Sequence, residues 1–448
     1  MMLVQSIPFW VMLTMTFINL KIKKRFFCIS TLSLSYLTLA MFGSIFLVLR
    51  PRTGWPYVRL DAMLFLTVCF ILFALPALFF KDGKISVSNF VDLPDKIVQN
   101  ISRVLIFITV PASVISAIIS IPDMITFFQM GGRREAFRNQ LIDYGGGFSS
   151  LPQLLLQLGL SFGIITVFWL IYCLVFNKQD KWSNILLSIG SLATCIASLR
   201  RVARGELFLL ALFATICIIL FFQFISEQNK HKLKKYAVVA VLIFAVPFMA
   251  ISIGRFKKDI CYSFYSYFTT GPYSFSADYA ARVEGNTKPL NGYLTIGWHL
   301  FLLDKAMGSN YYKQAKTYDR NYHYSGNKKQ ASSPEIDLIY RRISGSYSAE
   351  FPTLAGILLK DYHISLVIIF SVFFSIFYCM IFSLAKKPSV AQSLCASVYF
   401  YILSISVMLY PFMTKRKSFH LALIWTFIIL LSFLQAKYYR DAEAPTKD

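Results

Sequence analysis

The segment ASLRRVARGE, residues 197–206, places three arginines and one glutamate between two apolar runs, 183–199 and 207–225. Each run is long enough to enter a bilayer as a helix, so these charges fall at the mouth of two membrane helices. Charged side chains at that depth are costly in hydrocarbon, and they either reach the lipid–water interface or serve a function. Arg200 and Arg204 are four positions apart and share a helix face if the second helix begins early. We expect this face to bind phosphate or, alternatively, to anchor helix ends among lipid headgroups.

The composition is that of a membrane protein. Of the 448 residues, 56% are hydrophobic and only 15% are charged, whereas soluble domains carry about 25% charged residues. The net charge is +23, but the positive residues are spread over many segments between apolar runs. This spread argues against a nucleic-acid partner and for topology signals and attraction to anionic lipid. The eight cysteines form no C-x-x-C pair and the five histidines form no H-E-x-x-H motif, so no metal site is predicted.

Apolar runs of spanning length predict an all-α polytopic integral membrane protein with about eleven transmembrane helices. The runs are 3–20, 27–49, 60–80, 103–121, 151–176, 183–199, 205–226, 235–253, 363–385, 390–412 and 418–436. A further apolar segment, 351–359, is too short to span and is either re-entrant or interfacial. The basic cluster 21–25 follows the first run, which predicts a retained first helix with its N-terminus outside.

These runs also predict how the chain is divided. We expect N-terminal transmembrane helices in 1–121, a medium outer loop with an Arg/Gly cluster in 122–150, central transmembrane helices in 151–253, a large and partly helical outer loop in 254–350, and C-terminal transmembrane helices with a short cytoplasmic tail in 351–448. The large loop is rich in Tyr, Ser, Asn and Gly, and a structureless loop of that length is uncommon unless it is functional. Its tyrosines suit stacking against sugar rings, and they also suit an interfacial layer.

The kind of cation differs between the two predicted sides of the membrane. With the N-terminus outside, the inner segments hold 16 Lys and 3 Arg, whereas the outer segments hold 15 Arg and 11 Lys. The planar guanidinium of arginine binds phosphate bidentately and is less strongly hydrated than an ammonium. An arginine-rich outer face therefore indicates that a multi-oxygen anion is handled there, with chance and interfacial anchoring as the alternative.

Short motifs stand at the ends of the predicted helices. They are Arg204-Gly205 opening a helix, Gly254-Arg255 at the start of the large loop, the YFTTGP segment 267–272, and the FPTLAG segment 351–356 leading to Asp361-Tyr362. With the helix number and the large outer loop in the second half, this pattern resembles the Wzy-type O-antigen polymerases (oligosaccharide repeat unit polymerases). Members of that family often carry an Asp-Phe-Gly-like turn, where this chain has Asp361-Tyr362-His363 without the glycine.

The resemblance implies a glycosyltransferase of the bacterial inner membrane whose active face is periplasmic. Such enzymes transfer a growing glycan from polyprenyl pyrophosphate to the non-reducing end of an incoming lipid-linked repeat unit. The resemblance implies no cofactor, nucleotide sugar or metal. The implied partners are polyprenyl-pyrophosphate-linked oligosaccharides, membrane lipids and a polysaccharide chain-length regulator, with no nucleic acid.

Transfer from a pyrophosphate requires that the departing charge is stabilised and that the acceptor hydroxyl is deprotonated. For catalysis we expect Arg204 and Arg255 at the leaving group, with His323 or Glu350 as the base. Candidates for binding the substrate are Arg133, Arg134, Arg138, Arg200, Arg201, Arg341 and Tyr267. Other outer-side candidates for the base are His299, His420, Glu206, Asp278, Glu284 and Asp361. Asp361 is equally suited to pair with Lys360 or to cap the following helix.

Two other functions remain open from the sequence. An O-antigen ligase shares the donor and the leaving group but uses another acceptor, and the sequence does not separate the two. A lipid-linked oligosaccharide flippase or other transporter is the alternative from a different class. The predicted helices are almost free of charge at mid-length and the polar residues gather in one long loop, which favours surface chemistry over translocation.

Overall fold

The protein is described by a computed structural model that covers residues 2–49, 58–81, 90–129, 159–193, 195–196, 205–225, 269, 271–272, 275–276, 279, 283, 292, 294–311, 314, 353–384, 388–408, 411–412 and 415–443. Regular structure in these residues is helical, with a single bridge between Val91 and Ser389 as the only strand-like pairing there. Six of the described helices are long and apolar enough to cross a membrane: α1 (Met2–Lys23), α2 (Ile29–Leu49), α3 (Leu60–Phe79), α4 (Asp95–Gln129), α17 (Ile364–Leu384) and α19 (Lys415–Glu443). The chain is therefore an all-α protein with membrane-spanning helices, as expected.

Shorter helices complete the described part of the chain. Three of them are apolar, namely α7 (Gly163–Phe176), α10 (Gly205–Phe221) and α18 (Val390–Ile405). The others are α8 (Lys181–Ser191), the 3-10 turn η2 (Phe222–Phe224), α13 (Gly297–Met307) and α16 (Leu354–Asp361). Each apolar run predicted from the sequence overlaps one of the helices except 235–253, which lies outside the described residues. The number eleven, and the sizes of the two loops, stay predictions.

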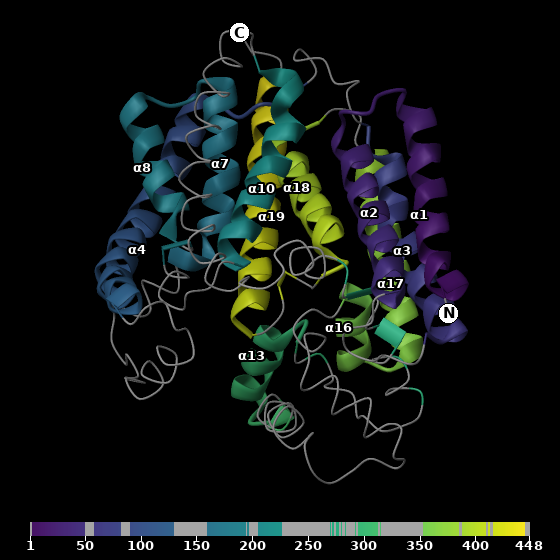
Figure 1. Cartoon of the computed structure of the whole chain (residues 1–448). Helices are drawn as coiled ribbons and strands as arrows, with labels where there is room; N and C mark the ends of the chain where they lie inside the picture. The colour runs from purple at the N-terminus through teal and green to yellow at the C-terminus, as the bar shows by residue number, and fades with distance from the viewer. Residues whose placement is uncertain are drawn as a thin grey trace. The chain divides into compact units, whose positions relative to one another are not determined.

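The helices belong to two compact units, each considered by itself. The first comprises Met1–Lys84, Asp259–Lys386 and Tyr399–Leu421; the second comprises Ile85–Lys258, Lys387–Val398 and Ala422–Asp448. In the first unit, α1 and α2 are antiparallel (Figure 1). Gln5, near the start of α1, donates to Ser44, near the end of α2, at 3.0 Å, and Asn19 donates to Thr31 at 2.8 Å.

Helix α3 runs parallel to both α1 and α17. The ammonium of Lys23 donates to the backbone carbonyls of Leu78, at 3.0 Å, and Phe80, so α1 and α3 end together. Phe80 also packs on Phe382, near the end of α17, with ring centroids 4.9 Å apart. The starts of α1, α3 and α17 therefore lie at one end of the unit, which we call the loop end. The opposite end carries the cluster 21–25 and Lys81, and we call it the lysine end.

Helices α16 and α18 meet within the first unit. Helix α16 directly precedes α17, and residues 399–405 of α18 belong to this unit. Helix α18 ends at Ile405, short of the predicted end at 412, and the carbonyl of Ser406 accepts the N–H of Leu354 at 2.7 Å. The Ser406 hydroxyl donates to the carbonyl of Leu403 at 2.7 Å. This side-chain hydrogen bond competes with the backbone hydrogen bonds that would continue the helix. The N-terminus of α16 therefore abuts the end of α18, with their dipoles aligned favourably.

Helix α16 is buried over most of its length, including its leucines and Asp361. The re-entrant and interfacial interpretations of 351–359 both stay predictions. In contrast, α17 exposes apolar side chains such as Phe373, Ile376 and Met380, as a helix surrounded by lipid does.

The second unit is built on close contact between α4 and α8. A Cβ at Gly190 would lie 2.1 Å from the hydroxyl oxygen of Thr109, and Ser113 donates to the carbonyl of Ile189 at 2.7 Å. Small residues that let two backbones approach, with hydroxyls bonding across the interface, are typical of helix packing in membranes. Helix α4 also continues past its predicted end at 121, through Pro122, to Gln129.

Candidate functional site

The loop end of the first unit carries the described cluster that is best suited to a site, and it is built around α16. Thr353 caps this helix, since its hydroxyl oxygen accepts the N–H of Gly356 at 3.0 Å. The helix ends at Asp361, and only Tyr362 and His363 separate it from α17. This sharp reversal brings Asp361 and Tyr362 to the entrance of a membrane-spanning helix. We call Gly292, Leu294, Thr295, Asp361 and Tyr362 the α16 corner.

Asp361 ties the region predicted as the large loop to this corner. Its two carboxylate oxygens accept the backbone N–H groups of Leu294, at 2.9 Å, and Thr295, at 2.7 Å. The residue is fully buried. Hydrogen bonds to a carboxylate are among the stronger ones in proteins, and a buried acceptor is costly to leave without its donors. Asp361 therefore positions the loop, and its burial argues against the expectation that it is a base that reaches an acceptor hydroxyl.

Tyr362 adds a second tie between the same two segments. Its hydroxyl lies 2.7 Å from the hydroxyl of Thr295. Burial raises the pKa of Tyr362 above its ordinary value, the Thr295 hydrogen bond opposes this, and the nearby Asp361 carboxylate adds to it. The phenol therefore stays protonated at neutral pH.

Gly292 allows the loop to turn into the corner. Its φ of +87° lies in the left-handed region, which favours glycine. A Cβ at this position would lie 2.7 Å from Cγ1 of Ile296 and 3.1 Å from the hydroxyl oxygen of Tyr362. Glycine is thus required both by the backbone conformation and by the space.

Helix α13 extends this loop segment and is fixed to the first turns of α19. The N–H of Trp298 donates to the hydroxyl of Ser418 at 2.9 Å, and the rings of Trp298 and Phe419 lie 4.5 Å apart. The far end of α13 is closed by Asp304, which accepts from the hydroxyl of Ser309 at 2.6 Å and from the N–H of Tyr311 at 3.0 Å. Parts of the region 254–350 are therefore ordered against membrane helices.

An earlier part of the same region contacts the starts of α1 and α3. The N–H of Arg59 donates to the hydroxyl of Ser276 at 2.8 Å, and the amide of Gln5 donates to the carbonyl of Pro272 at 3.5 Å. Phe65 of α3 stacks on Phe275 with centroids 6.3 Å apart. The described end of the predicted motif 267–272 thus lies at the loop end of the unit.

The residues predicted to perform the chemistry all lie outside the described part of the chain. They are Arg204, Arg255, His323 and Glu350 for catalysis, and Arg133, Arg134, Arg138, Arg200, Arg201, Arg341 and Tyr267 for substrate binding. Of the other candidates for the base, Asp278, Glu284 and the side chain of Glu206 lie outside it too. His299 is exposed on α13, whereas His420 is buried on α19. The described part of helix α10 begins at Gly205.

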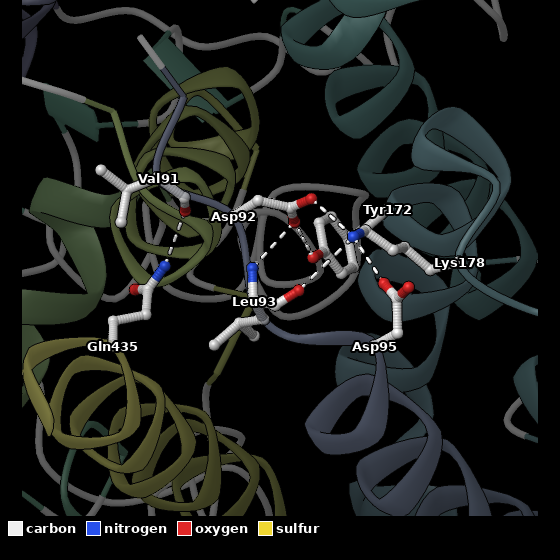
Figure 2. Close-up of polar contacts among 7 residues, drawn as sticks. All are labelled: Val91, Asp92, Leu93, Asp95, Tyr172, Lys178 and Gln435. Atoms are coloured by element: carbon white, nitrogen blue, oxygen red, sulfur yellow. Dashed lines mark hydrogen bonds and ion pairs between the residues drawn. The ribbon is translucent and has the colours of Figure 1, made fainter. Parts of the chain in front are cut away.

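A second polar cluster lies in the second unit, where α7 turns into α8 (Figure 2). Asn177, with a φ of +52°, ends α7, and Asp180 caps α8 by accepting the N–H groups of Trp182 and Ser183. Between these two helices, the ammonium of Lys178 lies 2.8 Å from Asp92 and 2.7 Å from Asp95. The turn thus presents one cation to two carboxylates.

The same cluster also holds the segment before α4 at several points. Tyr172 donates its hydroxyl hydrogen to Asp92, and the N–H of Leu93 donates to the same oxygen at 2.9 Å. On the other side of the segment, the amide of Gln435 donates to the carbonyl of Val91 at 2.9 Å, as Figure 2 shows. Partial burial lowers the pKa of Lys178, but its hydrogen bonds to the two aspartates outweigh this and the net direction is upward. These contacts join the segment before α4 to α7, to the α7–α8 turn and to α19, which is a structural role.

The sequence singled out Asp361 and Tyr362 but not the loop residues that they contact, and it did not predict the Lys178 cluster. The dipeptide Asn291-Gly292 is a turn signal. For the second cluster, the signal is the pair Asp92 and Asp95 shortly before one apolar run, with Lys178 shortly after another. Within the described residues, no group of three or more His, Cys, Asp or Glu side chains can hold a metal ion.

These contacts hold described parts of the region 254–350 against helices of the first unit. No family model, curated protein or solved structure matches this chain.

Proposed function

We propose that this protein polymerises lipid-linked oligosaccharide repeat units at the periplasmic face of the bacterial inner membrane. In the reaction, a hydroxyl oxygen of an incoming repeat unit attacks the anomeric carbon of the growing glycan. The bond from that carbon to the pyrophosphate oxygen breaks, and polyprenyl pyrophosphate leaves with the electron pair. The hydroxyl proton passes to a base of the protein. No metal is required, because arginines stabilise the departing charge.

The observation that carries the proposal is the contact of Asp361 with Leu294 and Thr295. A polymerase of lipid-linked glycans must hold a polar, sugar-binding segment where the pyrophosphate of a membrane-anchored lipid emerges. The α16 corner holds part of the Tyr-rich region 254–350 three residues before the membrane-spanning helix α17 begins. A merely connecting loop would not need a fully buried carboxylate to fasten it.

The start of α10 supports the same proposal from the second unit. Helix N-termini attract phosphate because their free N–H groups and dipole favour negative charge. Arg204 directly precedes Gly205, the first described residue of α10. We assign this arginine to the pyrophosphate leaving group, with Arg255 and the arginines of 133–138 as further contacts.

The glycan profile of cells lacking the gene tests the proposal. A polymerase predicts that surface glycan collapses to a single repeat unit still joined to its final acceptor, and the intact gene restores the ladder. Polymer accumulating on polyprenyl pyrophosphate indicates a ligase instead. Single lipid-linked units accumulating on the cytoplasmic side indicate a flippase and contradict the proposal.

A further inference from the structure

A groove opens between α3 and α17 in the first unit, in the parts of both helices toward the lysine end. Its volume is about 420 Å³, and it is lined by Leu75, Phe79, Ser375, Ile376, Cys379, Met380 and Ser383. This volume lies in the range of pockets that hold small molecules. The lining surface is almost entirely apolar.

The groove lies between two helices that are candidate membrane spans. Its lining residues fall within two candidate membrane spans, Leu60–Phe79 and Ile364–Ser383. Phe79 and Ile376 are about half exposed, so the groove is on the surface that α3 and α17 present to their surroundings. In a membrane, these surroundings are lipid chains or another transmembrane helix.

Cations gather at the end of the groove. The ammonium of Lys23 is fixed on the carbonyls of Leu78 and Phe80, which flank the groove residue Phe79. Lys81 follows two residues after Phe79, and Lys24 follows Lys23; both are exposed. Basic side chains at this level attract anionic headgroups. A transmembrane helix of a partner would bring an apolar surface to the groove and would not by itself call for these charges.

We propose that the groove binds one anionic phospholipid, with an acyl chain between α3 and α17 and its phosphate among Lys23, Lys24 and Lys81. The apolar groove takes the chain, and the lysines select lipids with net negative charge over zwitterionic ones. The site is independent of the proposed polymerase activity, because it lies at the lysine end and not at the loop end. It gives the protein a bound lipid that fills the α3–α17 surface.

Native mass spectrometry of the full chain in mild detergent tests the site. Phosphatidylglycerol and phosphatidylethanolamine with identical acyl chains are added in equal amounts, and retained lipid is counted per protein. The wild type is expected to retain phosphatidylglycerol in preference. Lys24→Gln with Lys81→Gln is expected to weaken that retention about fivefold for each lysine. The control pair Lys96→Gln and Lys181→Gln removes two exposed lysines of the second unit and is expected to leave retention unchanged.

A second pair of variants tests the groove itself. Cys379→Trp fills the groove and is expected to lower retention of both lipids, whereas Ile369→Trp, on an exposed part of α17 outside the groove, is expected to have no effect. Ser383→Phe, at the exposed edge, replaces Cys379→Trp if the latter fails to fold. Equal retention of the two lipids by the wild type overturns the proposal. Wild-type levels of lipid retention by Cys379→Trp overturn it as well. A wild-type dimer that Cys379→Trp converts to monomer also overturns it, since the groove is then a protein interface.

Discussion

The carboxylate of Asp361 accepts the backbone N–H of Thr295 at 2.7 Å, although 66 positions separate the two residues in the chain. With the bond to Leu294, this contact fastens the region 254–350 to the end of α16. Asp361 is fully buried, so the contact is shielded from water. The two bonds join a membrane-embedded helix to the polar region on which the proposed activity depends.

Replacement of Asp361 by alanine should release the loop segment without unfolding the membrane helices. Each hydrogen bond to a charged group contributes about 1.5–3 kcal/mol, so the loss is on the order of 3 kcal/mol or more. We expect faster proteolysis within 292–311 and loss of polymer, with normal helix content. Asp361→Asn should be intermediate, because it keeps one accepting oxygen.

The matched control is Asp304→Ala, which removes a carboxylate with two donors from the outer end of α13. Asp304→Ala should speed proteolysis only at the residues after α13. If Asp361→Ala and Asp304→Ala give the same cleavage pattern, or if Asp361→Ala resists protease as the wild type does, the α16 corner does not anchor the loop.

Alanine at Gly292 should be much more harmful than alanine at Gly308. Both glycines have positive φ, at +87° and +65°, so both substitutions add backbone strain of about 1–2 kcal/mol. Only at Gly292 does the new Cβ also collide, with Ile296 and the Tyr362 hydroxyl; at Gly308 the space is open. Thermal unfolding in detergent should show the larger drop for Gly292→Ala, with partial recovery when Ile296→Ala is added. Equal drops for the two glycines would disprove the role of the collision.

The Lys178 ion pair should give the protein a component of stability that is lost in alkali. The pKa of Lys178 is raised in the folded state, so its contribution is fully present below the ordinary lysine pKa of about 10.4. It is lost as the pH rises through the folded value. Melting temperatures should be measured from pH 8 to 12. In the upper part of this range, the melting temperature of the wild type should fall more than that of Lys178→Met.

At pH 8, the same variant should already melt lower than the wild type, because Asp92 and Asp95 lose the ammonium that both of them contact. Lys181→Met, which removes an exposed neighbouring lysine, should resemble the wild type across the range. A Lys178→Met curve parallel to the wild type at every pH would refute the ion-pair contribution.

Arg204 should be required for polymer and not for the amount of protein in the membrane. Loss of one charge-stabilising contact costs roughly 10²–10³ in rate. Arg204→Lys should restore little activity, because an ammonium does not reproduce bidentate phosphate contact. Arg103→Ala, on an exposed position of α4, is the control and should polymerise normally. Full polymerisation by Arg204→Ala would remove this arginine from the mechanism.

Much of the fold was accessible from the sequence because apolar runs of spanning length have few alternatives to a membrane helix. The end of α18 was not accessible, since 390–412 reads as one apolar run. The break depends on Ser406, whose backbone carbonyl accepts Leu354 from a distant segment. The sequence of residues 390–412 alone does not reveal that contact.

The candidate site was predictable only in part. The Asp361-Tyr362 motif drew attention to residues that the structure places at the α16 corner. The partners of Asp361 were not predictable, because they are backbone N–H groups, which every residue except proline supplies. Arg204 and the other catalytic candidates lie outside the described residues and stay predictions.

The most direct test of the central claim is reconstitution of the reaction. Purified full-length protein in liposomes is given lipid-linked repeat units, without nucleotide sugar or added metal, and the products are separated by gel and mass spectrometry. The account predicts a ladder of oligomers on polyprenyl pyrophosphate with one free polyprenyl pyrophosphate released per bond formed. Repeat units that remain single, with no pyrophosphate lipid released by a protein whose helix content and monodispersity are intact, would contradict it.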